Sequence, residues 1–297
     1  MKQRVHLTAR VPERVAAALE ELFELASEPD GAAGLVAVPS VLVDAALLDR
    51  AGPELRIVAN YAVGVDNVDL AEARARGVVV TNTPDVLTRA TAEHTLALLL
   101  ALVRRVVEGD RLLRRREPWR IEPTFMLGRG LPGRTLGIVG AGRIGREVAR
   151  LAEALGMQTL TAGREDGLDE VLAADVVSLH VPLTEATRHL IDADALRRMR
   201  PTSVLVNTSR GPVVDEAALV RALRGGTIAG AALDVFENEP RVHPGLLELD
   251  NVVLTPHIAS ATHEAREAMG LLCVDALRAV LLDGRRPEHV VDGTEHS

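Results

Sequence analysis

Short runs of branched apolar residues alternate along the chain with longer segments whose apolar residues recur at helical spacing. The runs at 135–140, 175–180 and 203–208 are typical of buried strands, because apolar residues follow one another with little polar alternation. The segment 214–226 places Ala and Leu at helical spacing and ends in a pair of glycines, which stops a helix. Strands and helices in alternation predict an α/β fold whose parallel sheets are covered on both faces.

The pattern is interrupted once, near the middle of the chain. A long helical pattern begins near Thr91, and an irregular stretch rich in Gly and Pro follows it at 117–134. After this stretch the pattern starts again with a strand and a glycine turn. We therefore predict two α/β domains bridged by helices.

The glycine turn follows the apolar strand directly. It reads Gly140-Ala141-Gly142-Arg143-Ile144-Gly145, and a helix with one apolar face comes next. In a dinucleotide-binding turn the first glycine permits the tight turn, the second lets the backbone approach a pyrophosphate, and the third lets helix and strand pack closely. Free N–H groups at the start of the helix then face the phosphates. This context favours a dinucleotide site over a merely structural turn.

The choice of dinucleotide depends on the end of the second strand, where an acidic residue binds the ribose of NAD. Here the strand end carries no acidic residue, and Arg164 follows it. An arginine at this place can bind a 2′-phosphate, so NADP(H) is favoured over NAD(H). Glu165 and Asp166 come directly afterwards, and their negative charges oppose the positive charge of Arg164. NAD(H) therefore stays open as the alternative.

Three consecutive predicted strands in the last third of the chain end beside polar residues. Arg210 follows the first strand, Glu237 and Glu239 follow the second, and His257 follows the third. Because α/β proteins bind ligands outside the carboxyl ends of parallel strands, we expect these side chains to converge beside the cofactor.

These residue types together suit the reduction of a carbonyl group. A carboxylate hydrogen-bonded to His257 favours the imidazolium form, which can donate a proton to the carbonyl oxygen as hydride reaches the carbon. Arg210 can bind a substrate carboxylate at two points and polarise the neighbouring carbonyl. Each residue also has a purely structural alternative. Arg210 could form an ion pair between loops, His257 could be a capped strand-end residue, and Glu239 could be a solvated loop carboxylate. Asp234, one step inside the sheet, could orient a carboxamide or pair internally.

Composition limits the class of protein. The 297 residues are enough for two domains, and the net charge of −8 disfavours a nucleic-acid surface. Cys273 is the one cysteine, which excludes a disulfide framework, and no metal site is expected. The N-terminus lacks the apolar core of a signal peptide, and the longest apolar run, 95–103, is too short to span a bilayer. We therefore expect a cytoplasmic protein without a membrane partner.

Two further histidines are weak candidates for function. His94 lies in the long helical pattern and His189 in a polar turn, and neither has a partner at metal-ligand spacing. We expect solvated or capping roles for both.

The motifs as a set resemble the D-isomer-specific 2-hydroxyacid dehydrogenases, and within that family the glyoxylate/hydroxypyruvate reductases. The resemblance covers nearly the whole chain, through the segments 63–93, 135–145, 175–191, 207–219, 233–240 and 255–262. It implies two Rossmann-like/flavodoxin-like parallel-sheet domains with a cleft between them. The substrate domain would be discontinuous, the last helix would return to it, and homodimers would be usual. The implied boundaries are 1–98 with 264–297 for the substrate domain and 99–263 for the dinucleotide-binding domain.

The resemblance also implies roles for individual residues. Arg210, Glu239 and His257 would be the catalytic residues, with His257 as the acid/base; Glu239, directly before Pro240, matches the family's catalytic position. The backbone at Val63 and Gly64 would hold the substrate carboxylate, together with Arg210 and His257. The implied cofactor-binding residues are Thr91, Gly140, Gly142, Arg143, Ile144, Gly145, Arg164, His180, Val181, Pro182, Thr187, Thr208, Ser209, Asp234 and Ala259.

The chain departs from the family pattern after Arg164, where a helix and a short strand of most relatives are missing. This shortens the adenosine side of the expected site. Relatives that oxidise formate carry Gln in place of Glu239, and many phosphoglycerate dehydrogenases have a further regulatory domain that this chain lacks.

The predicted function is the NAD(P)H-dependent reduction of a small 2-keto acid of the glyoxylate/hydroxypyruvate type to the D-2-hydroxy acid. Two alternatives stay open. One is a phosphoglycerate or phosphite dehydrogenase of the same family, and the other is a non-catalytic NAD(H)-sensing interaction protein. The acidic charge and the absence of a peptide-docking extension oppose the second alternative.

Overall fold

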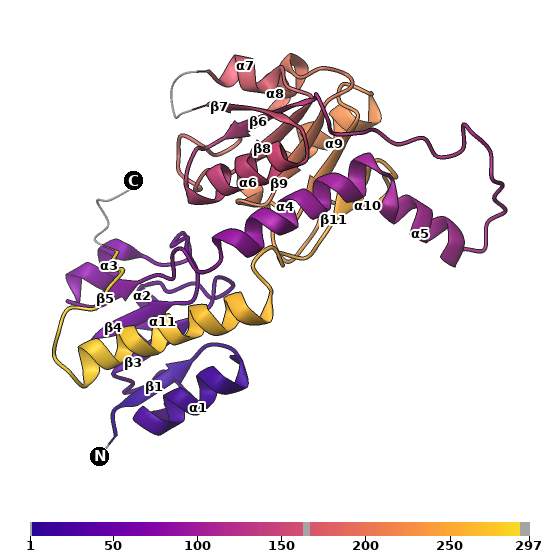
Figure 1. Ribbon diagram of the computed structural model, residues 1–297. Coiled ribbons are helices and arrows are strands. Elements are labelled where there is room, and N and C mark those ends of the chain that lie inside the picture. The colour runs from indigo at the N-terminus through magenta and orange to yellow at the C-terminus, as the bar shows by residue number, and fades with distance from the viewer. Residues whose placement is uncertain (1, 163–166, 292–297) are drawn as a thin grey trace. The chain divides into compact units, whose positions relative to one another are not determined.

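A computed structural model describes residues 2–162 and 167–291, which form two compact α/β units (Figure 1). Unit 1 contains the chain up to Leu87 and again from Ala261, and unit 2 contains Thr88–Ser260. Each unit has one parallel sheet, of five and six strands respectively, which confirms the predicted fold class. The units divide at 87/88 and 260/261 rather than at the implied 98/99 and 263/264, because the helix that begins at Thr88 packs on the sheet of unit 2.

Unit 1 has the strand order β2-β1-β3-β4-β5. Its strands are β1 (Arg4–Leu7), β2 (Glu24–Ala26), β3 (Gly34–Ala37), β4 (Ile57–Asn60) and β5 (Val79–Thr81). Its helices are α1 (Glu13–Leu22), α2 (Ala45–Ala51), α3 (Leu70–Ala75) and α11 (His263–Leu281). Helix α11 returns from the far end of the sequence and packs on α1, β3 and β4. Residues of α2 and α3 share a separate apolar core with β3, β4 and β5, so both faces of the sheet are covered.

Unit 2 has the strand order β11-β10-β9-β8-β6-β7. Its strands are β6 (Thr135–Val139), β7 (Gln158–Ala162), β8 (Val176–Leu179), β9 (Val204–Asn207), β10 (Gly230–Leu233) and β11 (Val252–Leu254). Its helices are α4 (Thr88–Val103), α5 (Val106–Arg114), α6 (Arg143–Ala154), α7 (Leu168–Leu172), α8 (Ala193–Arg198), α9 (Glu216–Arg224) and α10 (Pro244–Leu247), with a 3-10 turn at Gly211–Val213. One core joins α4 and α6 to the sheet, and a second core joins α7, α8 and α9 to its other face (Figure 1).

Strand β8 shows how fully the sheet of unit 2 is covered. All four of its residues are buried, including Ser178, and it lies between β6 and β9. A strand that is covered on both faces needs apolar residues on both sides, which explains the runs without alternation. None of the described helices has both the length and the apolar composition required to cross a membrane.

Within the described residues, the sheet of unit 2 has fewer strands on the β7 side than the usual dinucleotide-binding sheet. In the usual dinucleotide-binding order 3-2-1-4-5-6, β6 and β7 correspond to strands 1 and 2. Within the described residues no strand pairs with the outer edge of β7, and residues 163–167 alone separate β7 from α7. This segment is too short for a helix and a strand, in agreement with the missing segment expected from the sequence.

Candidate active site

Three neighbouring strands of unit 2 end at the same level. The register of β9, β10 and β11 aligns Asn207, Leu233 and Leu254, which are the last residues of the three strands. Arg210, Glu239 and His257 follow in the three loops. The parallel sheet therefore brings the loops that carry the predicted guanidinium, carboxylate and imidazole to one edge.

His257 and Glu239 form a direct pair. His257 Nδ1 lies 2.8 Å from Glu239 Oε2, while Glu239 Oε1 accepts a hydrogen bond of 3.0 Å from the Phe236 N–H. Partial burial of Glu239 acts to raise its pKa, but the hydrogen bonds from His257 and Phe236 and the positive charges of His257 and Arg210 outweigh burial and lower the pKa. An ionised carboxylate only accepts hydrogen bonds, so Nδ1 carries the proton in this pair and Nε2 is left for another partner.

The backbone of His257 is held in an unusual conformation by Asp234. His257 has a φ of +52°, in the left-handed region, and its N–H donates to the Asp234 carbonyl at 2.7 Å. The Asp234 side chain is fully buried and accepts hydrogen bonds from the Thr255 hydroxyl at 2.6 Å and from the N–H groups of Ile258 and Ala259 at 2.9 and 2.7 Å. The loop that carries His257 is therefore wrapped around one carboxylate.

Asp234 is ionised despite its burial. Burial acts to raise its pKa, but the hydrogen bonds from His94, Thr255, Ile258 and Ala259 outweigh it and lower the pKa below its usual value. Of the two roles left open for Asp234, the structure shows the internal pairing.

The loop that carries Arg210 is shaped by Asn207, a residue that the sequence patterns did not single out. The buried Asn207 amide donates to the Arg210 carbonyl at 2.9 Å, and its Oδ1 accepts from the N–H and the hydroxyl of Ser209. The next residue, Gly211, touches the neighbouring loop so closely that a Cβ there would lie 1.9 Å from the carbonyl of Phe236. A polar residue at the end of a buried strand was the available signal for Asn207.

The glycine turn has the geometry that a pyrophosphate site requires. Gly140 has a φ of +100° and packs on the carbonyl of His180, where a Cβ would lie 2.5 Å from the oxygen. Gly142 is the N-cap of α6 and has open space around its Cα. Gly145 packs against the carbonyl of Gly140, where a Cβ would lie at 2.1 Å. Arg143 and Ile144 are the first residues of α6. The geometry therefore suits the predicted roles of Gly140 in the tight turn, Gly142 in the approach to a pyrophosphate and Gly145 in helix–strand packing.

The other predicted cofactor residues after β8 lie in one loop. His180, Val181 and Pro182 follow the strand directly, and the Thr187 hydroxyl donates to the Pro182 carbonyl at 2.6 Å. His180 Nε2 lies 2.9 Å from Ser178 Oγ, and burial lowers the pKa of His180 to about 4. His180 is therefore a neutral imidazole near pH 7, which does not add a positive charge to this edge.

Helix α4 is tied to the loop after β9. Thr95 Oγ1 donates to the Thr91 carbonyl at 2.8 Å and lies 2.9 Å from Thr208 Oγ1. The predicted residues Thr91 and Thr208 are thus linked through Thr95. Ser209 and Ala259 lie in the loops after β9 and β11, beside Arg210 and His257 respectively.

The remaining predicted residues are Arg164, Val63 and Gly64. Arg164 is outside the described residues. Val63 and Gly64 belong to unit 1, in the loop after β4, where the amide groups of Asn82 and Asn60 donate to their carbonyls at 2.8 Å each.

His94 and His189 each have a specific side-chain partner, which the expectation of solvated or capping roles did not include. His94 Nε2 lies 3.1 Å from Thr255 Oγ1 and 3.4 Å from Asp234 Oδ1. His189 Nε2 lies 2.7 Å from Glu237 Oε1. Both contacts join residues that are far apart in the sequence, so neither was visible from spacing.

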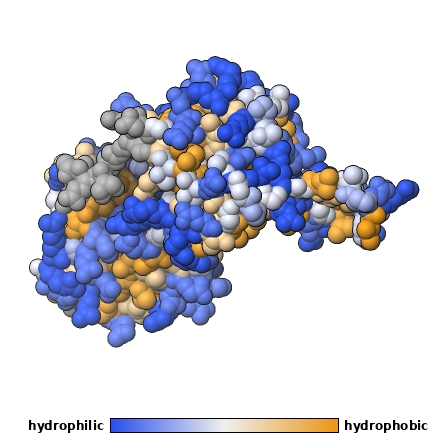
Figure 2. All heavy atoms as spheres, turned by 45° about the horizontal axis from the view of Figure 1, so that its top comes forward, coloured by the Kyte–Doolittle hydropathy of each residue, from blue (hydrophilic) through white to orange (hydrophobic). Residues whose placement is uncertain are grey.

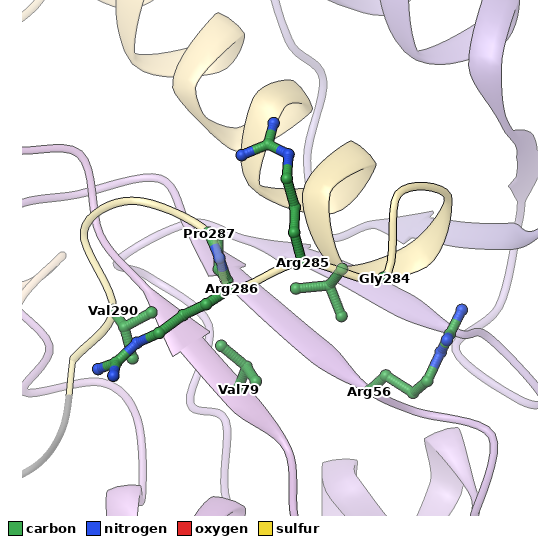
Figure 3. A pocket seen from close by; sticks show the side chains of 8 residues that line it. Arg56, Val79, Gly284, Arg285, Arg286, Pro287 and Val290 are labelled. Atoms are coloured by element: carbon green, nitrogen blue, oxygen red, sulfur yellow. The ribbon is translucent and has the colours of Figure 1, made fainter.

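A separate hollow lies in unit 1, at the start of β5 and the end of α11 (Figure 3). Its lining includes Arg56, Arg285 and Arg286, but Figure 3 shows their guanidinium groups pointing in different directions. Arg56 donates to the Leu281 carbonyl, and Arg285 pairs with Asp283. We therefore do not assign an anion site to this hollow.

Comparison with known proteins gives concordant results. The family model "D-isomer specific 2-hydroxyacid dehydrogenase, NAD binding domain" matches residues 96–259. A glyoxylate reductase of Korarchaeum cryptofilum is 49% identical over 311 aligned residues, with 94% of this chain and 93% of the relative covered. This alignment is longer than the 297-residue chain, so the archaeal protein contains residues that this chain lacks.

Two solved structures are similar over nearly the whole chain. A protein of Thermus thermophilus matches with a TM-score of 0.92 and 43% identity, over 97% of this chain and 100% of the other. An NADPH-dependent glyoxylate/hydroxypyruvate reductase of Sinorhizobium meliloti, in complex with NADP and malonate, matches with a TM-score of 0.87 and 39% identity, over 99% and 98% of the two chains.

The role of Asp234 in the loop can be tested by Asp234→Asn. One amide NH₂ would face N–H donors, so we expect the free energy of unfolding at pH 7 to fall by about 1–3 kcal/mol. The folded-state pKa of Asp234 is lowered, so its contribution is present above the unfolded-state pKa of about 3.9 and is lost as pH falls through the folded-state value. Urea unfolding from pH 7 into acid should show the two proteins converging. Asp194→Asn, on an exposed ion pair with Arg197, is the control, and equal stability of Asp234→Asn and wild type at pH 7 would contradict the role.

Proposed function

Because the chain belongs to the D-isomer-specific 2-hydroxyacid dehydrogenase family, we propose that it catalyses the NAD(P)H-dependent reduction of a small 2-keto acid to the D-2-hydroxy acid. The observation that carries this proposal is the pair of His257 and Glu239, held beside Arg210 at the edge that also carries the glycine turn. Glyoxylate or hydroxypyruvate is the proposed substrate, since relatives with these names match over most of the chain. The same relatives give no support to a phosphoglycerate or phosphite dehydrogenase or to a non-catalytic sensing protein.

The proposed mechanism assigns one task to each polar group. Bound NAD(P)H supplies the hydride. The imidazolium of His257 donates the proton on Nε2 to the keto oxygen as negative charge develops there. The ionised Glu239 accepts from Nδ1–H, which orients the ring and stabilises its positive charge. Arg210 binds the substrate carboxylate with its guanidinium and polarises the adjacent carbonyl.

The residues present fit a dinucleotide. The open space at Gly142, the start of the twelve-residue helix α6 and the close packing at Gly140 and Gly145 suit a pyrophosphate. We propose that NADPH is preferred over NADH, on the basis of Arg164 and of the NADPH-dependent relative from Sinorhizobium meliloti. Thr91, His180, Val181, Pro182, Thr187, Thr208, Ser209 and Ala259 are the further proposed cofactor contacts, whereas Asp234 contributes by holding the loop of His257.

A substrate role is proposed for unit 1 as well. Val63 and Gly64 would offer backbone groups to the substrate carboxylate. Their carbonyls accept hydrogen bonds from the amide groups of Asn82 and Asn60, which hold the loop. The backbone N–H groups of the two residues would be the donors to an anion.

We further propose that the protein is a homodimer. Helix α5 has no buried residue, and it extends with the following segment away from the sheet of unit 2 (Figure 1). The projecting arm, residues 106–127, exposes a set of large apolar side chains. These residues are Val106, Leu113, Trp119, Ile121, Phe125 and Leu127. Figure 2 shows patches of hydrophobic colour on the projecting part of the surface. Apolar surface of this kind is rare on monomers and marks a protein interface, and a second copy is the proposed partner.

The dimer can be tested at its most exposed apolar residue. Ile121 is 92% exposed, and Ile121→Asp should place a charge in the proposed interface and raise the dimer dissociation constant at least about tenfold. Sedimentation velocity over a concentration series would measure this. Leu247→Asp, at an exposed apolar residue of α10, should leave the dimer intact. A wild-type protein that sediments as a monomer would overturn the proposal.

The reaction itself is tested by mixing the protein with NADPH or NADH and a panel of glyoxylate, hydroxypyruvate, pyruvate and phenylpyruvate. We expect loss of the reduced cofactor with glyoxylate or hydroxypyruvate, faster with NADPH. Faster turnover with NADH would keep the reaction and reject the role of Arg164. Cofactor binding without turnover of any keto acid would reject the proposed function.

The acid role of His257 is tested by His257→Gln. We expect kcat to fall at least about a hundredfold while the dissociation constant of the reduced cofactor stays near the wild-type value, because a general acid has been removed. Steady-state kinetics and fluorescence titration would measure the two quantities. His263→Gln, at an exposed histidine of α11, is the control. An unchanged kcat for His257→Gln would refute the mechanism.

A further inference from the structure

We propose that His189, Glu216 and Glu237 form a loop bracket that positions the catalytic Glu239 and Arg210. The bracket consists of positioning residues, and its role rests on the proposed function. It joins the loops after β8 and β10 to the first residue of α9, the helix that follows β9.

The contacts between Glu216 and Glu237 run in both directions. Glu237 Oε1 lies 2.7 Å from His189 Nε2, and the Glu237 N–H donates to Glu216 Oε1 at 2.6 Å. The Glu216 N–H donates in return to Glu237 Oε2 at 3.4 Å. The His189 N–H donates to the carbonyl of Pro212 at 2.8 Å, which ties the loop after β8 to the loop after β9 as well.

The bracket is connected directly to the catalytic carboxylate. Glu239 folds back on its own loop and accepts from the N–H of Phe236, which is the neighbour of Glu237. Fixing the backbone at Phe236 and Glu237 therefore fixes the anchor from which Glu239 reaches His257. On the other side, Gly211 packs against the carbonyl of Phe236, and Gly211 directly follows Arg210. The same backbone thus sets the position of both catalytic loops.

Helix capping does not account for Glu216. The first turn of α9 is already capped by Asp215, whose carboxylate accepts from the Ala218 N–H at 2.8 Å. Glu216 is only 4% exposed, and its carboxylate turns to the neighbouring loop. Burial raises the pKa of Glu216, and the hydrogen bond from the Glu237 N–H opposes that rise. Burying a carboxylate is costly unless it is hydrogen-bonded. The hydrogen bond from the Glu237 N–H offsets this cost for Glu216, whose carboxylate α9 does not need as a cap.

The bracket also gives Glu237 a histidine partner of its own. Glu237 lies two residues before Glu239 and has the same side chain. His189 and the N–H of Glu216 engage both oxygens of Glu237, which leaves Glu239 to pair with His257. His189 takes up this position with a φ of +51°, a strained conformation that its contacts with Glu237 and Pro212 stabilise.

The test compares His189→Gln and Glu237→Ala with wild type. His189 is partly exposed, so its variant is expected to fold. We expect kcat for keto-acid reduction to fall about tenfold while the KM of the reduced cofactor changes little. We also expect the alkaline limb of the pH profile of kcat/KM to move to lower pH, because a displaced Glu239 no longer favours the protonated His257. Glu216→Gln keeps an acceptor oxygen and should retain the wild-type profile, whereas Glu216→Ala should shift it.

Glu248→Ala is the matched control, since it removes a carboxylate that pairs with Arg224 on the exposed side of α9. A fall in activity with an unchanged alkaline limb, in proportion to a lower melting temperature, would show that the bracket only supports the fold and would overturn the proposal. If wild type turns over no keto acid, the proposed function fails instead. Crystal structures of wild type and His189→Gln then decide the bracket: a retained 2.8 Å contact of His257 Nδ1 with Glu239 Oε2 overturns it, and a lost contact supports it.

Discussion

Parallel pairing of β9, β10 and β11 is the constraint on which the candidate active site depends. Because the last residues of these strands are in register, the loops that follow them must start side by side. Short loops then keep Arg210, Glu239 and His257 near this edge, although the first and the last are far apart in the sequence. The strands of this sheet are buried on both faces by helices.

The edge is held together by carboxylates that each have a different task. Asp234 is fully buried and organises the loop of His257, Glu239 pairs with the imidazole, and Glu237 pairs with His189. Hydrogen bonds outweigh burial for Asp234 and Glu239 and lower their pKa values, whereas burial prevails for Glu216 and raises its pKa. Four acidic residues within one sheet edge are therefore compatible with a stable fold, because each carboxylate accepts a hydrogen bond from a specific donor.

At the opposite edge of the same sheet, the described residues form fewer strands than the usual dinucleotide-binding order has. The sheet ends at β7 within the described residues, and the archaeal relative has residues that this chain lacks. The glycine turn is unaffected by this difference, since Gly140 and Gly145 pack on the backbone of His180 and of the turn itself. The packing that shapes the pyrophosphate part of the proposed dinucleotide site therefore comes from the turn itself and from the loop after β8.

The sequence by itself determined the fold class, the glycine turn and the strand-end positions of Arg210, Glu239 and His257, because these features are local. A buried strand requires an apolar run, and a tight turn before a helix requires glycine, wherever they occur. The resemblance already pointed to Glu239 as the partner of His257, but only the tertiary structure decided that Glu237 meets His189. This second pairing joins residues 48 positions apart. The roles of Asn207 and Glu216 were hidden for the same reason, since their hydrogen bonds depend on loop geometry that packing between neighbouring strands imposes.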